Sequence, residues 1–150
     1  MIVACGFDHA GVPLRQILLD LVVAQGHEVL DLGTDTIEPI DYPQKALDVG
    51  RAILSGRAER GIIVCGSGAG VSIAASKIRG IYAATVHDTY TAHQAVEHDG
   101  LNVLCLGGRV VGVAVAAEIV TAFLQAEVSG EERHVRRRGQ VLEIERTGGE

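Results

Sequence analysis

The sequence predicts an α/β protein in which a five-stranded parallel sheet is covered by helices on both faces. Short apolar runs alternate with glycine-containing turns and longer amphipathic segments through most of the 150 residues. This repeat is typical of parallel strands joined by helical crossovers. The length fits one domain, so we expect residues 1–150 to form a single unit. The predicted strands are residues 1–7, 27–33, 61–66, 80–86 and 102–108.

The first two predicted helices have clear boundaries in the sequence. In residues 11–27 the apolar side chains recur at helical spacing, and Gly26 marks the end of the helix. In residues 41–56, Pro43 falls in the first turn, where proline fits because its missing N–H has no helical partner.

The remaining helices follow the last three strands and the tail. Residues 70–78 begin one helix, and residues 88–100 form the next, with Asp88 as its N-cap. Residues 112–128 form a long apolar helix. The basic segment that follows is expected to form a last helix, docked on the domain or on a second subunit, with disorder from about residue 147.

Composition excludes several classes of function. The net charge of -6 repels nucleic acid, so we expect no such partner. No long uncharged apolar stretch predicts a membrane span, and the N-terminus lacks a signal-peptide pattern. The three separated cysteines suggest neither a disulfide framework nor a zinc site, which favours the cytoplasm and no bound metal.

Candidate functional residues gather after the predicted strands. Ligands on parallel sheets bind beyond the carboxyl ends of the strands. The segment IIVCGSGAG, residues 62–70, places a thiol, Cys65, before a loop whose glycines alternate. This spacing differs from the GxGxxG dinucleotide fingerprint, and no Walker GK[ST] follows. The loop either binds an anion through its backbone amides or is a tight turn that needs glycine.

Cys65 allows two interpretations. Backbone amides and a helix N-terminus beside the thiol favour a thiolate that acts as nucleophile or base. Alternatively, Cys65 is a buried core residue, as free cysteines usually are.

Acidic, imidazole and guanidinium groups occupy other loop positions. Asp8 and His9 follow the first strand and serve either a polar ligand or the cap of the next helix. His98 ends a helix, as a proton donor and acceptor or as a favourable C-terminal charge. Arg133 and Arg137, four residues apart, share a helix face and could grip a phosphate, or else form a solvated surface.

Five motifs in order resemble the type B ribose-5-phosphate isomerases and the related galactose-6-phosphate isomerase subunits. They are CGFDHAG, DYP at residues 41–43, CGSGAGVSIAASK, EHDGLNVLCLGGRVVG and RHVRRR. The resemblance implies a Rossmann-like three-layer αβα sandwich with a C-terminal helix, assembled as a homodimer or tetramer. It also implies aldose–ketose isomerisation of a phosphorylated sugar without a cofactor.

The resemblance further implies a role for each matching residue. Cys65 is the general base of a cis-enediolate mechanism, and His98 assists opening of the sugar ring. The site lies between subunits, with the His98 and Arg109 region supplied by the neighbouring chain. The other implied site residues contact the sugar, its phosphate or the developing oxyanion: Asp8, His9, Tyr42, Gly66, Ser67, Gly68, Ala69, Gly70, Asp99, Arg109, Arg133 and Arg137.

Two positions bear on the subtype. Some relatives use a glutamate in the helix after the loop, and Val71 at this position places the chain in the cysteine-based group. Asp99 stands where relatives commonly carry asparagine, which leaves the sugar open. The preferred reaction interconverts D-ribose 5-phosphate and D-ribulose 5-phosphate. The alternatives are a tetrose 4-phosphate such as erythrulose 4-phosphate, allose or galactose 6-phosphate, and a non-catalytic sugar-phosphate-binding module.

Overall fold

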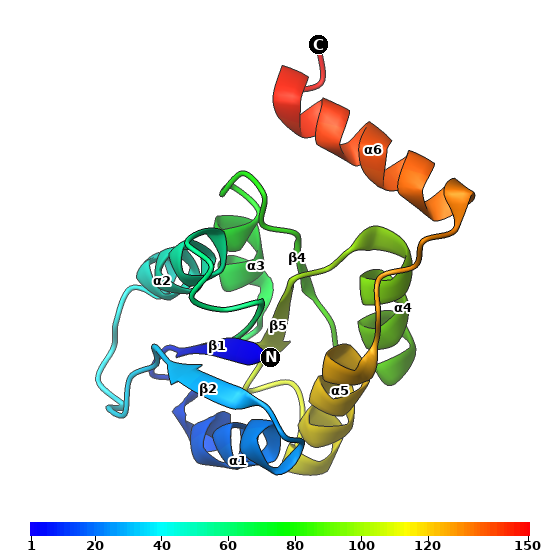
Figure 1. Ribbon diagram of the computed structural model, residues 1–150. Coiled ribbons are helices and arrows are strands. Elements are labelled where there is room, and N and C mark those ends of the chain that lie inside the picture. Colours follow the sequence, from blue (N-terminus) through cyan, green and yellow to red (C-terminus); the bar gives the residue numbers. More distant parts are fainter.

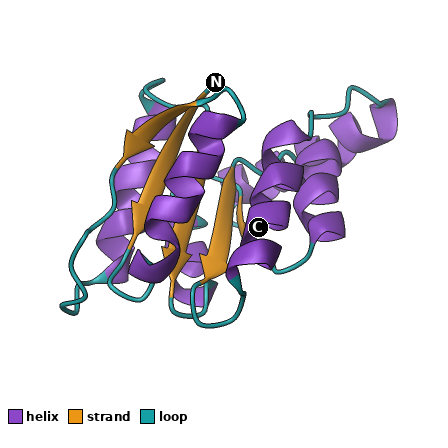
Figure 2. Cartoon of the chain, turned by 90° about the horizontal axis from the view of Figure 1, so that it is seen from below, coloured by secondary structure: helices purple, strands orange, loops and turns teal.

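Five strands form one sheet in the order β2-β1-β3-β5-β4, and every neighbouring pair is parallel. This computed structural model describes residues 1–150 and confirms the predicted α/β sandwich. The arrowheads in Figure 2 all lie toward the same end of the sheet. The strands are β1 (Ile2–Phe7), β2 (Glu28–Asp31), β3 (Arg60–Cys65), β4 (Ala83–Thr85) and β5 (Val103–Gly107). The helices are α1 (Val12–Ala24), α2 (Tyr42–Leu54), α3 (Ala69–Ala75), α4 (Thr89–Asp99), α5 (Val113–Gln125) and α6 (Glu132–Thr147).

Side-chain alternation along the strands divides the core into two layers. Val3, Cys5 and Phe7 of β1 pack with α1, α4 and α5 on one face of the sheet. Ala4, between them, points to the other face and packs with α2 and α3. Figure 1 shows these two helical layers on opposite sides of the strands. Because successive strand residues point to opposite faces, one apolar run supplies both cores.

The predicted helix boundaries agree with the structure at three places. Gly26 follows α1 in a left-handed conformation with a φ of 81°. Pro43 lies in the first turn of α2. Asp88 caps α4, since its Oδ1 accepts the Thr91 N–H at 2.7 Å.

The fourth strand is shorter than the sequence predicts. Instead of residues 80–86, β4 covers only three residues. The Asn102 side chain explains part of this difference, because its Oδ1 accepts the Tyr82 N–H at 2.8 Å and its Nδ2 donates to the Gly80 carbonyl at 3.0 Å. These backbone groups are satisfied by a side chain instead of by a strand ladder.

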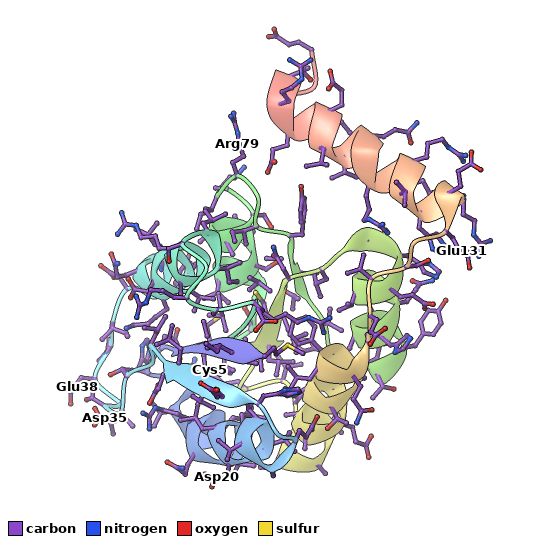
Figure 3. The ribbon with its side chains drawn as sticks, in the orientation of Figure 1. Cys5, Asp20, Asp35, Glu38, Arg79 and Glu131 are labelled. Carbon is purple, nitrogen blue, oxygen red and sulfur yellow. The ribbon has the colours of Figure 1, made fainter.

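The last helix stands away from the sheet. Figure 1 shows α6 extending beyond α4 after a linker from α5, and Figure 3 labels Glu131 just before its first turn. The helix ends at Thr147, followed by Gly148 in a left-handed conformation. The expected disorder from about residue 147 stays a prediction. None of the helices combines the length and apolar character needed to span a bilayer.

The sheet order fixes where a site can form. From β1 the chain moves outward to β2, and it then returns to place β3 on the other side of β1. The loops after β1 and β3 therefore diverge at a topological switch point, where parallel sheets leave a crevice. The first loop carries Asp8 and His9, and the second begins with Gly66.

Candidate active site

A pocket of about 470 Å³ opens at this switch point, and we call it the Cys65 pocket. The end of β3 and the loops after β1, β3 and β5 supply most of its lining, and the first turns of α2 and α3 supply the rest. Segments far apart in the sequence therefore converge on one thiol. The lining residues are Asp8, His9, Ala10, Tyr42, Cys65, Gly66, Ser67, Gly70, Arg109 and Val110.

The three thiols have different surroundings. Burial, followed by the charge of Asp31, raises the pKa of Cys5 to about 12. Burial, followed by the charge of Cys65, also raises the pKa of Cys105. Cys65 is 5% exposed at the pocket, and its Sγ accepts the Gly68 N–H at 3.1 Å. Cys65 therefore differs from the other two thiols in lining the pocket and in accepting a backbone N–H on its sulfur.

Two glycines of the loop are required by geometry. Gly68 has a φ of 80°, and a Cβ there would lie 2.9 Å from Thr85 Cγ2. A Cβ on Gly70 would lie 2.8 Å from the Tyr42 ring. Tyr42 therefore packs directly over the loop and forms one wall of the Cys65 pocket. The structure bears out the tight-turn interpretation, and this turn also brings the Gly68 amide to the Cys65 sulfur.

The loop amides have separate partners. The family resemblance implies that the amides of residues 66–70 stabilise the enediolate oxygen. In the structure the Gly68 N–H is committed to the Cys65 sulfur, and the Ala69 N–H donates to Ser67 Oγ at 3.3 Å. Neither Gly68 nor Ala69 lines the pocket. The amides left for an oxygen of the ligand are those of Gly66, Ser67 and Gly70.

Asp8 and His9 contact both the protein and the pocket. Asp8 is 4% exposed, and its Oδ1 accepts the N–H groups of Ala10 at 2.8 Å and Gly11 at 3.0 Å. This leaves Oδ2 for a ligand. His9 Nδ1 accepts the Ile40 N–H at 3.2 Å. In the neutral imidazole the proton then resides on Nε2, so His9 presents an N–H donor.

Arg109 lies in the Cys65 pocket of its own chain, and this differs from the expectation that it joins His98 on the neighbouring subunit. Its Nη1 is 3.7 Å from the position that a Cβ on Gly66 would occupy. The backbone explains the placement, since the Arg109 N–H donates to the Gly66 carbonyl at 3.1 Å and the Gly108 N–H donates to the Cys65 carbonyl at 2.7 Å. The loops after β3 and β5 are thus joined.

Sequence reasoning did not single out His87. Its Nε2 accepts the Gly107 N–H at 3.0 Å, at the end of β5, which leads into the Arg109 loop. The signal available in the sequence was its position just after the fourth strand. The contact itself depends on how β4 and β5 pair, which no local pattern reveals.

A second group of predicted residues lies elsewhere, at the end of α4 and on α6. None of its members lines the Cys65 pocket. Asp99 and Arg137 instead line a groove of about 510 Å³ between α6 and the body. We call these residues, together with His134, which the sequence did not single out, the His98 cluster: His98, Asp99, Arg133, His134 and Arg137.

Several contacts hold this cluster. The rings of His98 and His134 stack with their centroids 3.9 Å apart. Arg138, which had no predicted role, donates to the carbonyls of His98 at 3.1 Å and Ser129 at 2.8 Å. It therefore joins α6 to the end of α4. Arg133 is exposed and pairs with Glu131 at 2.9 Å.

The two groups offer complementary chemistry. The Cys65 pocket holds a thiol, N–H donors and a carboxylate, which are groups that proton transfer beside a carbonyl can use. The His98 cluster holds imidazole and guanidinium groups, which suit ring oxygens and phosphate. No three His, Cys, Asp or Glu side chains are grouped so that they could hold a metal ion.

Comparisons with known proteins agree with this chemistry. The family model described as Ribose/Galactose Isomerase matches residues 3–141. Ribose-5-phosphate isomerase B of Escherichia coli is 41% identical over 143 residues, covering 95% of each chain. D-erythrulose-4-phosphate isomerase of Pectobacterium atrosepticum is 40% identical over 129 residues, covering 85% of each. The structure of Clostridium thermocellum ribose-5-phosphate isomerase B superposes with a TM-score of 0.94 at 43% identity, covering 99% of each chain.

Proposed function

The chain belongs to the ribose/galactose isomerase family, and from this premise we propose that it interconverts D-ribose 5-phosphate and D-ribulose 5-phosphate with Cys65 as the general base. The observation that carries the proposal is the Cys65 sulfur, which accepts an amide N–H at 3.1 Å inside a pocket that also holds Asp8 and Arg109. Family membership argues against the non-catalytic binding module.

The proposed reaction uses only side chains and backbone amides of this protein. The Cys65 thiolate removes the proton from C2 of the open-chain aldose, and negative charge develops on the C1 oxygen. The free amides of the loop stabilise this cis-enediolate. The proton on O2 passes to O1, and the thiol returns its proton to C1, which leaves the carbonyl at C2. Asp8 contacts sugar hydroxyls through its free oxygen.

We assign ring opening and part of phosphate binding to the His98 cluster of a second subunit. One chain keeps the Cys65 pocket and the His98 cluster apart, although the chemistry needs both. Apolar side chains also remain exposed on α6, where a partner would cover them. They are Val135, Val141, Leu142 and Ile144. A homodimer, alone or paired into a tetramer, would complete two such sites by symmetry.

Phosphate binding then draws on both chains. Arg109 and His9 approach from the Cys65 pocket, and Arg133 and Arg137 approach from the His98 cluster. Remote contacts of this kind position the sugar without taking part in bond changes. Three free thiols and an acidic net charge fit a reducing cytoplasm, which we propose as the location.

Removal of the thiol tests the base. Cys65→Ala should lower kcat for ribose 5-phosphate by about 10²-fold or more, the usual cost of losing a positioned acid–base group. Cys5→Ala is the matched control, because it removes a buried thiol outside the pocket, and it should keep its activity. Activity of Cys65→Ala within a few-fold of wild type would overturn the base assignment.

A tetrose 4-phosphate is the second candidate substrate. Asp99 favours it, because its carboxylate adds negative charge beside the phosphate-binding Arg137, and one relative is named for erythrulose 4-phosphate. A panel of ribose 5-phosphate, erythrulose 4-phosphate, allose 6-phosphate and galactose 6-phosphate separates the candidates by kcat/KM. We expect ribose 5-phosphate to rank first. A higher value for the tetrose phosphate would reverse the order.

A further inference from the structure

One residue of α6 is buried against the rest of the molecule. His134 is the only buried residue of α6 and is 2% exposed, whereas the rest of the helix is exposed or half-buried. It lies in the first turn, where α6 meets α4 (Figure 1). His134 is therefore one of the residues, with Arg138 and Glu145, through which α6 is attached to the rest of the molecule.

His134 meets His98 face to face. The ring centroids are 3.9 Å apart, and the ring planes are inclined by 26°. This geometry covers one face of the His98 imidazole and leaves the ring nitrogens outside the stack. His98 Nε2 lies 3.7 Å from Glu97 Oε2, and the side chain is 31% exposed. The stack thus limits rotation of the ring without occupying the atoms that would exchange a proton.

The charge state of His134 suits a supporting role. Burial lowers the pKa of His134, the nearby His98, Arg133 and Arg137 lower it further, and only Glu131 opposes the shift. The ring is therefore neutral near pH 7. A neutral ring adds no second positive charge beside an imidazole that takes up a proton.

His134 is poorly placed to contact a ligand itself. Its Nδ1 is buried and has no hydrogen-bond partner. The contact that the structure shows for this side chain is the stack, which uses the face of the ring and not its nitrogens.

We propose that His134 is a positioning residue, which holds the His98 imidazole by stacking and fixes its place relative to Arg133 and Arg137 on the same helix. The proposal rests on the proposed function, in which His98 assists ring opening and the two arginines bind phosphate. Arg133 precedes His134, and Arg137 lies three residues after it, nearly one helical turn along. The contact between the His134 and His98 rings therefore sets the spacing between the His98 imidazole and the two arginines.

Two substitutions separate stacking from space filling. His134→Phe keeps a flat ring, and His134→Leu fills similar space without one. The intact assembly of each is assayed for kcat and KM with ribose 5-phosphate, alongside thermal unfolding. We expect His134→Phe to stay near wild type and His134→Leu to lose about tenfold or more in kcat, as misplacement of a reacting group does. Equal activities would show that His134 only fills space and would overturn the proposal.

A double-mutant cycle tests whether His134 acts through His98. If it does, His134→Leu should cost little in a His98→Gln background, because the group that it positions is already absent. Equal costs in both backgrounds would contradict the proposal. His93→Ala is the control, since His93 also contacts Glu97, at 3.4 Å, but stacks on neither ring.

Proton NMR of His98 tests the ring stack independently of enzyme activity. Ring protons of His98 lie over the His134 ring and should show upfield proton NMR shifts that persist in His134→Phe and vanish in His134→Leu. Unchanged His98 signals in His134→Leu would contradict the stack. Full activity of His98→Gln would instead contradict the proposed function while leaving this result intact.

Discussion

Cys65, Cys5 and Cys105 show at the residue scale how position determines the chemistry of a thiol. All three lie on strands, and Cys5 and Cys105 are fully buried. Only Cys65 is followed by a loop that turns an amide onto its sulfur. Figure 3 labels Cys5 on β1, within the body of the molecule.

Gly68 gives a prediction that separates strain from steric conflict. Gly68→Ala would place a Cβ 2.9 Å from Thr85 Cγ2 at a φ of 80°, whereas Gly26→Ala has a φ of 81° and nothing within 4 Å. Gly26→Ala should lower the free energy of unfolding by about 1–2 kcal/mol through strain alone. Gly68→Ala should lower the free energy of unfolding by more than Gly26→Ala does, and it should also lower activity. Urea denaturation of both variants measures the difference, and equal costs would contradict the steric account.

The residues after the strands could be predicted from the sequence, because parallel strands bring their carboxyl ends together. Asp8, His9 and Arg109 do line the Cys65 pocket, as do Tyr42 and Ser67, which the family resemblance implied. The ring stack of His134 could not be predicted, because it depends on how α6 meets α4. Nothing in the local pattern of RHVRRR distinguishes a buried imidazole from a solvated one.

At the element scale, α6 depends on few attachments. Arg138 bonds two carbonyls, one at the end of α4 and one in the linker before α6. The sequence predicted a last helix in this basic segment but not this bond, because the four arginines between residues 133 and 138 look alike. The short length of β4 could not be predicted for a similar reason, because it depends on hydrogen bonds from the Asn102 side chain, which is distant in the sequence.

Arg138→Gln tests this attachment. Loss of two bonds from a charged donor should loosen α6, so amide hydrogen exchange in its first turns should accelerate and KM should rise. Arg136→Gln is the matched control, because Arg136 is an exposed arginine for which the structure shows no contact. If both variants exchange alike, Arg138 does not hold the helix.

At the scale of the whole molecule, two histidines make stability depend on pH. Burial lowers the pKa of His27, as do the charges of the N-terminus and Arg60, and burial lowers the pKa of His134. Below about pH 6.5 the unfolded chain therefore binds more protons than the folded chain, so stability falls as pH falls.

The thermal midpoint should accordingly drop between pH 7 and pH 5, before most carboxylates titrate. Replacing both groups, in His27→Gln/His134→Phe, should flatten this part of the profile. His93→Gln, which changes an exposed imidazole, should leave the profile as it is. A profile with the same slope in the double variant would show that other groups cause the dependence.

The division of one site between two copies is the central claim, and subunit mixing tests it most directly. Cys65→Ala and His98→Gln, each inactive alone, are unfolded together and refolded. A heterodimer then has one intact site of two, so random pairing should restore about one quarter of wild-type activity. Cys65→Ala mixed with Asp8→Asn, which alters the same pocket, should restore none. If the first mixture shows no more activity than its separate components, the site is not shared between chains.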